Sequence, residues 1–205
     1  MAKLDKQRSI YLIVSIGAFL VFLLVYVLMT SNDMRDRGTG GEDGRLGGDF
    51  TLSSIDGDVS LTDFRGKVVL LYFGFVNCSQ VCPISMQIMQ QALDKLTAQE
   101  MEQVQALLVS VDIDNDNVEI VDDYVKRFHD NFIGLTGTLD EINHVVDEYG
   151  SYYSPTELKE IDEGRAFRHS SRFYVIDQQG ELVDAMRHST TPNELKARLR
   201  SLILI

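Results

Sequence analysis

The sequence predicts an α/β protein in which helices flank a mixed sheet. Residues 68–75 and 104–112 are continuous apolar runs, which are typical of strands covered on both faces. A segment with helical spacing of apolar residues follows each run, and a strand–turn–strand pattern lies over residues 170–188. Parallel strands joined by helices and closed by a hairpin give a mixed sheet.

The elements are expected in the following order. Phe50 and Leu52 alternate with polar residues, which indicates a β-hairpin that turns at Asp56-Gly57 before the strand over 68–75. A helix begins at Pro83, with Ile84 among its periodic apolar residues. The later elements are a strand over 104–112, a helix over 118–128, a short strand over 132–135, a helix over 139–149, an extended hairpin over 151–169, the strand pair over 170–188 and a last helix capped by Thr191.

The two cysteines of the chain, Cys78 and Cys82, lie between the first buried strand and the helix after it. A thiol at a helix N-terminus lies in a positive field that favours thiolate, the form that attacks disulfides and binds metals. The polar residues around the pair predict an exposed loop, with Cys78 more exposed than Cys82. A structural disulfide is the alternative, although a bridge across so short a loop adds little loop-closure entropy.

Three residues separate the cysteines, whereas classical thiol–disulfide oxidoreductases have two. The wider loop leaves room for an ion between the sulfurs, and two thiolates select soft metals, Cu(I) above all, with zinc possible. Two sulfurs leave the coordination incomplete, so a third ligand is expected. The residues alone leave four histidines open for this role: His129, His144, His169 and His188.

A cysteine pair that opens the first core helix of such a sheet resembles the thioredoxin fold, here with an added N-terminal hairpin. In that fold the loop matching the one with His169 faces the cysteine helix, so the fold analogy favours His169.

The segment YFGFVNCSQVCPISM, residues 72–86, is similar to the signature of the Sco/SenC family of copper chaperones, which reads approximately YFGFTHCPDVCP. The resemblance continues in VSVDIDNDNVEIVDDYVKRF, FIGLTGT and RHSSRFYVID, and extends from Phe50 to the C-terminus. The family is thioredoxin-like and binds one copper through two cysteines and a histidine, which correspond here to Cys78, Cys82 and His169. The resemblance implies delivery of copper to the CuA centre of cytochrome c oxidase subunit II, or reduction of the cysteines of that centre.

The sequence departs from the family pattern at three places. Gln80 and Arg168 stand where the family usually has aspartate, and Val76-Asn77 replaces Thr-His. Losing two acids and gaining a cation is expected to weaken copper binding, because neighbouring groups tune the ligands. The main hypothesis is a metallochaperone, not a turnover enzyme. The alternatives are a thiol–disulfide reductase, in which Cys78 attacks and Cys82 resolves, and a redox sensor.

Residues 10–29 form an uncharged apolar run of membrane length, preceded by Lys3, Lys6 and Arg8. The positive-inside rule leaves residues 1–9 in the cytoplasm and carries the rest of the chain across. A cleaved signal peptide is the alternative, but the run is long and no small-x-small cleavage site follows it. Residues 30–48 are typical of a flexible linker to a domain over 49–205. We therefore expect a single-pass protein of the bacterial inner membrane with its domain in the periplasm, or an equivalent arrangement.

The formal net charge of −12 excludes the electrostatic footprint of a nucleic-acid-binding protein. Four aspartates, Asp112, Asp114, Asp116 and Asp123, fall near the spacing of a calcium loop. Asn117 stands in place of the required glycine and a strand precedes the run, so we do not expect a calcium site.

Overall fold

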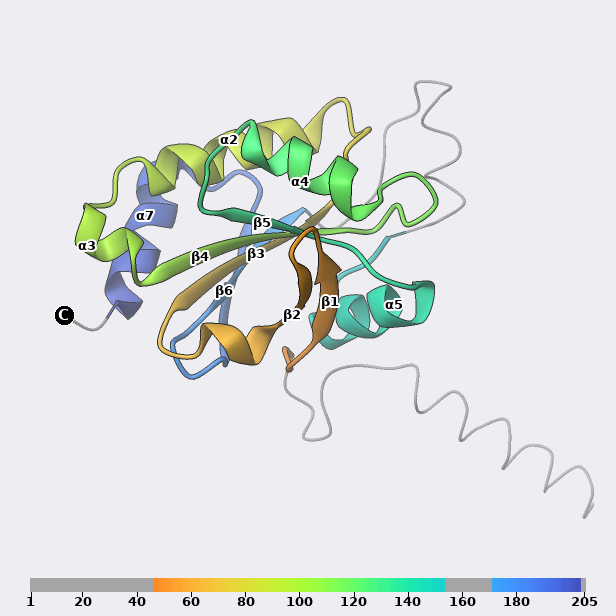
Figure 1. The fold of residues 1–205 in the computed structure, drawn as a ribbon. Helices are drawn as coiled ribbons and strands as arrows, with labels where there is room; N and C mark the ends of the chain where they lie inside the picture. Colours follow the sequence, from red (N-terminus) through yellow and green to blue (C-terminus); the bar gives the residue numbers. More distant parts are fainter. Residues whose placement is uncertain (1–45, 154–170, 204–205) are drawn as a thin grey trace, which may run out of the picture. The chain divides into compact units, whose positions relative to one another are not determined.

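The computed structural model describes residues 46–153 and 171–203 (Figure 1). The chain divides into two compact units, Met1–Gly38 and Thr39–Ile205, and every described residue belongs to the second. Across the described ranges no helix combines the length and apolarity needed to cross a membrane. The predicted cytoplasmic residues 1–9, membrane segment 10–29, linker residues 30–45 and most of the hairpin expected over 151–169 lie outside these ranges.

A five-stranded mixed sheet has the strand order β5-β4-β3-β6-β7. Strands β3, β4 and β5 run parallel, whereas β6 is antiparallel to both of its neighbours, β3 and β7. The bounds are β3 Val68–Gly74, β4 Val104–Ser110, β5 Phe132–Leu135, β6 Arg172–Ile176 and β7 Leu182–Arg187. The predicted mixed sheet flanked by helices is therefore confirmed.

Every residue of β3 and β4 is buried, which is why their sequences lack polar alternation. The helices α2 (Val81–Leu93) and α4 (Val118–Lys126) connect successive parallel strands in one direction across the sheet. Right-handed crossovers therefore place both on one face, where α7 (Pro192–Leu202) also packs against α2 (Figure 1).

The helix α5 (Leu139–Glu148) covers the other face of the sheet. Tyr149, directly after this helix, has its ring centroid 6.0 Å from that of Phe73 on β3. The preceding strand residue, Tyr72, points to the side of α2, because successive side chains of a strand alternate between faces. The central strand therefore contacts both helical layers at its carboxyl end.

The predicted boundaries agree with the structure within two residues, and one helix start and one assignment to a helix face differ instructively. The helix α2 begins at Val81, not at Pro83, because proline is tolerated in the first turn, where its missing N–H has no partner to lose. Ile84 is 59% exposed, so its assignment to the apolar face of this helix was wrong; Ser85 and Met86 are the buried residues of that turn. The short helices η1 (Leu61–Phe64) and α3 (Ala98–Met101) were not predicted.

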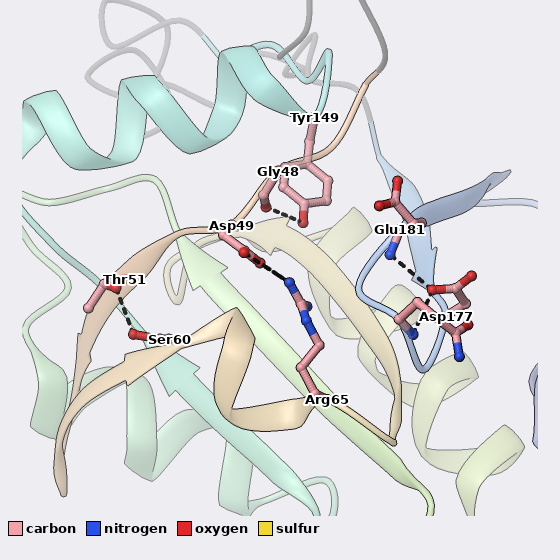
Figure 2. Close-up of polar contacts among 9 residues, drawn as sticks. Gly48, Asp49, Thr51, Ser60, Arg65, Tyr149, Asp177 and Glu181 are labelled. Carbon is pink, nitrogen blue, oxygen red and sulfur yellow. Dashed lines mark hydrogen bonds and ion pairs between the residues drawn. The ribbon is translucent and has the colours of Figure 1, made fainter. Parts of the chain in front are cut away.

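The predicted hairpin is confirmed as β1 (Thr51–Ser54) and β2 (Gly57–Ser60). Gly57 adopts a φ of 114°, a conformation that favours glycine and explains this residue at the turn. The hydroxyls of Thr51 and Ser60 share a hydrogen bond of 2.7 Å across the pair (Figure 2). An isolated bridge from Ser53 to Thr136 fixes the hairpin beside the end of β5.

Three contacts attach residues 47–49 to the domain. They are the hydrogen bond from the Gly47 amide to the Glu148 carbonyl (2.7 Å), that from the Tyr149 hydroxyl to the Gly48 carbonyl (3.1 Å), and the ion pair of Arg65 with Asp49 (2.6 Å; Figure 2). The neighbouring turn between β6 and β7 lies at the amino end of β3, because the Gly66 amide donates to the Gln178 carbonyl. The domain therefore begins at the end of the sheet opposite the carboxyl end of β3.

An ion pair joins the short helix α3 to the last helix, α7. The carboxylate of Glu100, on α3, lies 2.6 Å from the guanidinium of Arg200, on α7, and also accepts a hydrogen bond from the Thr97 amide. The hydrogen bond from Arg200 and the capping hydrogen bond lower the pKa of Glu100 from 4.5 to about 2.

This ion pair predicts an acid-dependent stability difference. A lowered folded-state pKa stabilises the fold above the unfolded-state pKa, and this stabilisation is lost as the pH falls through about 2. We expect Glu100→Gln to melt at a lower temperature than the original protein at pH 7, with the difference shrinking between about pH 4.5 and pH 2. The nearby control Glu102→Gln should show no such trend in thermal unfolding; a Glu100→Gln difference that is constant with pH would contradict the assignment.

Candidate functional site

The cysteine pair lies at the carboxyl end of β3. Cys78 is in the connection from β3 to α2, and Cys82 is the second residue of α2. Both are thiols that no disulfide joins, and the Cys82 amide donates a hydrogen bond of 3.4 Å to the Cys78 sulfur. Cys78 is 8% exposed and Cys82 0%, so the expected order is confirmed, but the expectation of an exposed pair was wrong. The polar loop residues are exposed around the sulfurs, while the sulfurs themselves pack inward.

Gly74, the last residue of β3, makes room for this inward packing. A Cβ atom at this position would lie 3.1 Å from the Cys82 sulfur and 2.9 Å from Cε1 of Tyr72. The Tyr72 ring and the Cys82 sulfur therefore both adjoin the space that a side chain at Gly74 would fill. A glycine inside an otherwise apolar strand is the sequence signal for such a close approach.

The electrostatics of Cys82 differ from the expectation based on the helix N-terminus. The hydrogen bond with Cys78, burial and the negative charge of Cys78 together hold the pKa of Cys82 well above its usual range. The thiolate expected from the helix field was therefore wrong for Cys82, because desolvation and the neighbouring sulfur outweigh the field. Cys82 is a thiol at neutral pH, and the amide at the start of α2 is directed at Cys78 instead.

Two tyrosines that the sequence reasoning missed lie beside the sulfurs. The hydroxyls of Tyr72, on β3, and Tyr124, on α4, are buried, and neither has a hydrogen bond of ordinary geometry within the described residues. Burial is the main cause that raises the pKa of both, with the charge of Cys82 as the next cause. Both are therefore neutral donors near the pair. Their sequence signal is weak, since an aromatic residue in a buried strand or on an apolar helix face usually only fills the core.

Asp116 is a further polar residue at this edge of the sheet. It lies in the connection from β4 to α4 and is 1% exposed. Its Oδ2 accepts hydrogen bonds from the Val76 amide (2.8 Å) and from the Ser110 hydroxyl (2.5 Å). Burial raises the pKa of its carboxyl. The aspartates of this region do not converge on a cation: within 46–153 and 171–203, no three His, Cys, Asp or Glu side chains form a group that could hold a metal ion.

The predicted histidine ligand, His169, lies outside the described residues, so its place is a prediction. Of the other histidines, His144 and His188 are exposed, and His129 accepts a hydrogen bond from the Asn131 amide through Nδ1. The described strand after His169 does adjoin the site. Tyr72 is paired with Phe173 across β3 and β6, and the Ser171 side chain lies near enough to the Tyr72 hydroxyl to lower its pKa.

A polar pocket of about 240 Å³ lies elsewhere, where residues 46–49 meet the β6–β7 turn. Asp49, Arg65 and Glu181 contribute to its lining (Figure 2). Because this turn lies at the amino end of β3, the pocket and the cysteine pair are at opposite ends of the sheet.

Comparison with known proteins gives consistent results. The family model SCO1/SenC matches residues 38–204. The human mitochondrial protein SCO1 homolog is 33% identical over 156 residues, which make up 75% of this chain and only 52%, about half, of the human protein. Arabidopsis thaliana ScoI, solved with copper bound, is 31% identical with a TM-score of 0.66, over 77% of this chain and 98% of that one.

A third similar protein is BsSco, a member of the Sco family of cytochrome c oxidase assembly proteins in which a disulfide switch was identified. It is 26% identical with a TM-score of 0.63, over 78% of this chain and 94% of its own. The family model extends over every described residue.

The burial of Cys82 and its raised pKa predict unequal reactivity of the two thiols. In the reduced protein at pH 7.5, we expect iodoacetamide to modify Cys78 at least about tenfold faster than Cys82, since only thiolate reacts and each pKa unit changes its fraction tenfold. Mass spectrometry of the peptides gives both rates, and the protein unfolded in guanidinium provides the control with similar rates. Faster modification of Cys82 in the folded protein would contradict the assignment.

Proposed function

Because the chain belongs to the SCO1/SenC family, we propose that it is a copper carrier that takes part in the assembly of cytochrome c oxidase. The observation that carries the proposal is the pair of adjacent reduced thiols at the carboxyl end of β3, beside two buried hydroxyl donors. Two thiol sulfurs are a soft donor set that suits Cu(I). A similar structure, that of Arabidopsis ScoI, contains copper.

We propose Cys78, Cys82 and His169 as the copper ligands. The position of β6 supports the histidine, since Ser171 adjoins Tyr72, which itself neighbours the Cys82 sulfur. Consecutive Cα atoms are 3.8 Å apart, so the Cα of His169 can lie no further than about 7.6 Å from that of Ser171. An imidazole in this loop therefore has the reach to complete the two sulfur ligands. The cation Arg168 and the neutral Gln80 are expected to weaken the binding.

Copper binding would involve the protons of both thiols. Each cysteine ligates as a thiolate, so Cu(I) displaces a proton from Cys82, whose pKa is raised. Copper affinity therefore falls as the pH falls, because protons compete for the sulfurs. Release occurs by ligand exchange with cysteines of the partner, for which we propose the CuA centre of cytochrome c oxidase subunit II.

We further propose that residues 10–29 anchor the domain in the bacterial inner membrane, with the domain in the periplasm. The attachment of residues 47–49 at the amino end of β3 supports a tethered carrier, because the cysteines lie at the other end of the sheet, away from the attached residues. The linker expected over 30–48 is shorter at its domain end, because Gly47 and Gly48 are bonded to the domain. A flexible linker over 30–45 would span roughly 22 Å root-mean-square, which raises the effective concentration of the site near membrane partners.

A second candidate function is thiol–disulfide reduction. The reduced pair favours it, as does the disulfide switch identified in BsSco. In this reaction Cys78 attacks a disulfide of the partner, one partner thiolate leaves, and Cys82 then attacks the mixed disulfide and releases the second. The pair becomes a disulfide as the partner gains two electrons. The same chemistry would serve a redox sensor.

The ligand set predicts the behaviour of variants in a copper titration. We expect the reduced protein to bind one Cu(I), and His169→Ala to lower the affinity at least about tenfold, because one of three ligands is lost. Competition with a chromogenic Cu(I) chelator measures both affinities. His144→Ala, which changes an exposed histidine on α5, is the matched control and should bind as the original protein does.

Two results would overturn the carrier assignment. One is an absence of stoichiometric Cu(I) binding by the reduced original protein. The other is an unchanged affinity in His169→Ala combined with rapid reduction of protein disulfides. The second result would establish the reductase function instead.

The anchor makes a separate prediction. The full chain should sediment with membranes and resist extraction by sodium carbonate, whereas a chain lacking residues 1–30 should be soluble, because a span of apolar side chains holds a protein irreversibly. Immunoblotting of the fractions provides the measurement. Release of the full chain by carbonate, or N-terminal cleavage after the apolar run, would exclude a membrane-spanning anchor.

A further inference from the structure

Two connections at the carboxyl edge of the sheet are held together by a single carboxylate oxygen. The Val76 amide, two residues before Cys78, and the Ser110 hydroxyl, at the end of β4, both donate to Oδ2 of Asp116. Gly74 and Ser110 are cross-strand partners, and the Val111 amide donates to the Gly74 carbonyl. The start of the cysteine loop is therefore fastened to the neighbouring strand through Asp116.

The Asp116 carboxylate is itself held in place. Its own amide donates to the Asp112 carbonyl at 2.8 Å, and the Asn115 side-chain amide donates to both carboxylate oxygens of Asp112. The β4–α4 connection is thus a preformed support. The backbone of Asp116 is therefore fixed within its own connection, and Ser110 on β4 holds its carboxylate from outside the cysteine loop.

A carboxylate is a costly choice for this position. Asp116 is 1% exposed, and its second oxygen, Oδ1, is buried with no hydrogen-bond partner within the described residues. A buried carboxylate without full hydrogen bonding destabilises a fold. A residue that weakens the fold and is nevertheless bonded to the loop of the functional thiols suggests a role in that loop.

We propose that Asp116 is a positioning residue for the cysteine pair: through the Val76 N–H it holds the loop so that the two adjacent sulfurs stay separate thiols that can bind copper rather than joining in a disulfide. Only the expected effect on copper affinity rests on the proposed function. The expected effect on disulfide formation does not, because the geometry of the pair governs it directly. Tyr124 links the two regions, since the charges of Cys78, Cys82 and Asp116 all influence its pKa. The Asp116 carboxyl group and the two cysteine sulfurs therefore all lie near the phenol of Tyr124.

The proposal distinguishes the hydrogen bond from the charge and from overall stability. Asp116→Ala removes the acceptor of the Val76 N–H, whereas Asp116→Asn keeps an acceptor oxygen and removes the charge. Ser110→Ala removes the other hydrogen bond to the same oxygen and leaves the contact with the cysteine loop. We expect Asp116→Ala to lower Cu(I) affinity at least tenfold, and Asp116→Asn and Ser110→Ala to stay within about threefold of the original protein.

The second measurement needs no copper. The purified proteins are equilibrated with glutathione, where the dithiol and one glutathione disulfide give the protein disulfide and two glutathiones. Without the hydrogen bond to Asp116, the loop is free to bring the two sulfurs together. We therefore expect Asp116→Ala to shift the equilibrium toward the protein disulfide at least tenfold, equivalent to about 30 mV. Asp116→Asn should restore the original equilibrium, and thermal unfolding reports how much stability each variant loses.

The copper and glutathione measurements distinguish failure of the proposed function from failure of the positioning role. If the original protein does not bind Cu(I), the proposed function fails, and the glutathione equilibrium still decides the role of Asp116. If Asp116→Ala only melts earlier, as Ser110→Ala does, and neither equilibrium moves more than about threefold, the positioning role is overturned. It is also overturned if Asp116→Asn behaves as Asp116→Ala, because the charge rather than the hydrogen bond would then be responsible.

Discussion

The close packing of the Cys82 sulfur against the carboxyl end of β3 is the constraint on which the rest of the site depends. The contact requires Gly74, because a side chain there would occupy the space of the sulfur. It also removes Cys82 from solvent, so that burial and the neighbouring Cys78 raise its pKa. The thiols are consequently unequal: Cys82 is a buried proton donor, and the Cys78 sulfur receives the Cys82 amide, the second of α2.

The edge of the sheet that carries the thiols is unusually rich in buried polar groups. The hydroxyls of Tyr72 and Tyr124 and one oxygen of Asp116 are buried without hydrogen-bond partners in the described part of the chain. Each such group disfavours folding, because water is lost and no partner replaces it. Hydrophobic burial of β3 and β4 and the capped helices compensate elsewhere.

Local patterns predicted most of the fold, since hydrophobic periodicity and capping act over a few residues. Thr191 caps the last helix as expected, and its hydroxyl accepts a hydrogen bond from the Glu194 amide. Ile84 was assigned wrongly, because one turn of periodicity does not determine which side of α2 faces the sheet. That choice depends on how the helix docks, with Met86 and not Ile84 turned inward.

The sequence by itself determined that two thiols stand between a buried strand and a helix, because motif and periodicity are local properties. His169 as their third partner stays a prediction. Only the tertiary structure decided that Cys82 is fully buried and protonated, and that Asp116 accepts a hydrogen bond from the loop of Cys78. Val76, in that loop, and Asp116 are 40 positions apart in the chain and meet only because β3 and β4 are parallel neighbours that end at the same edge.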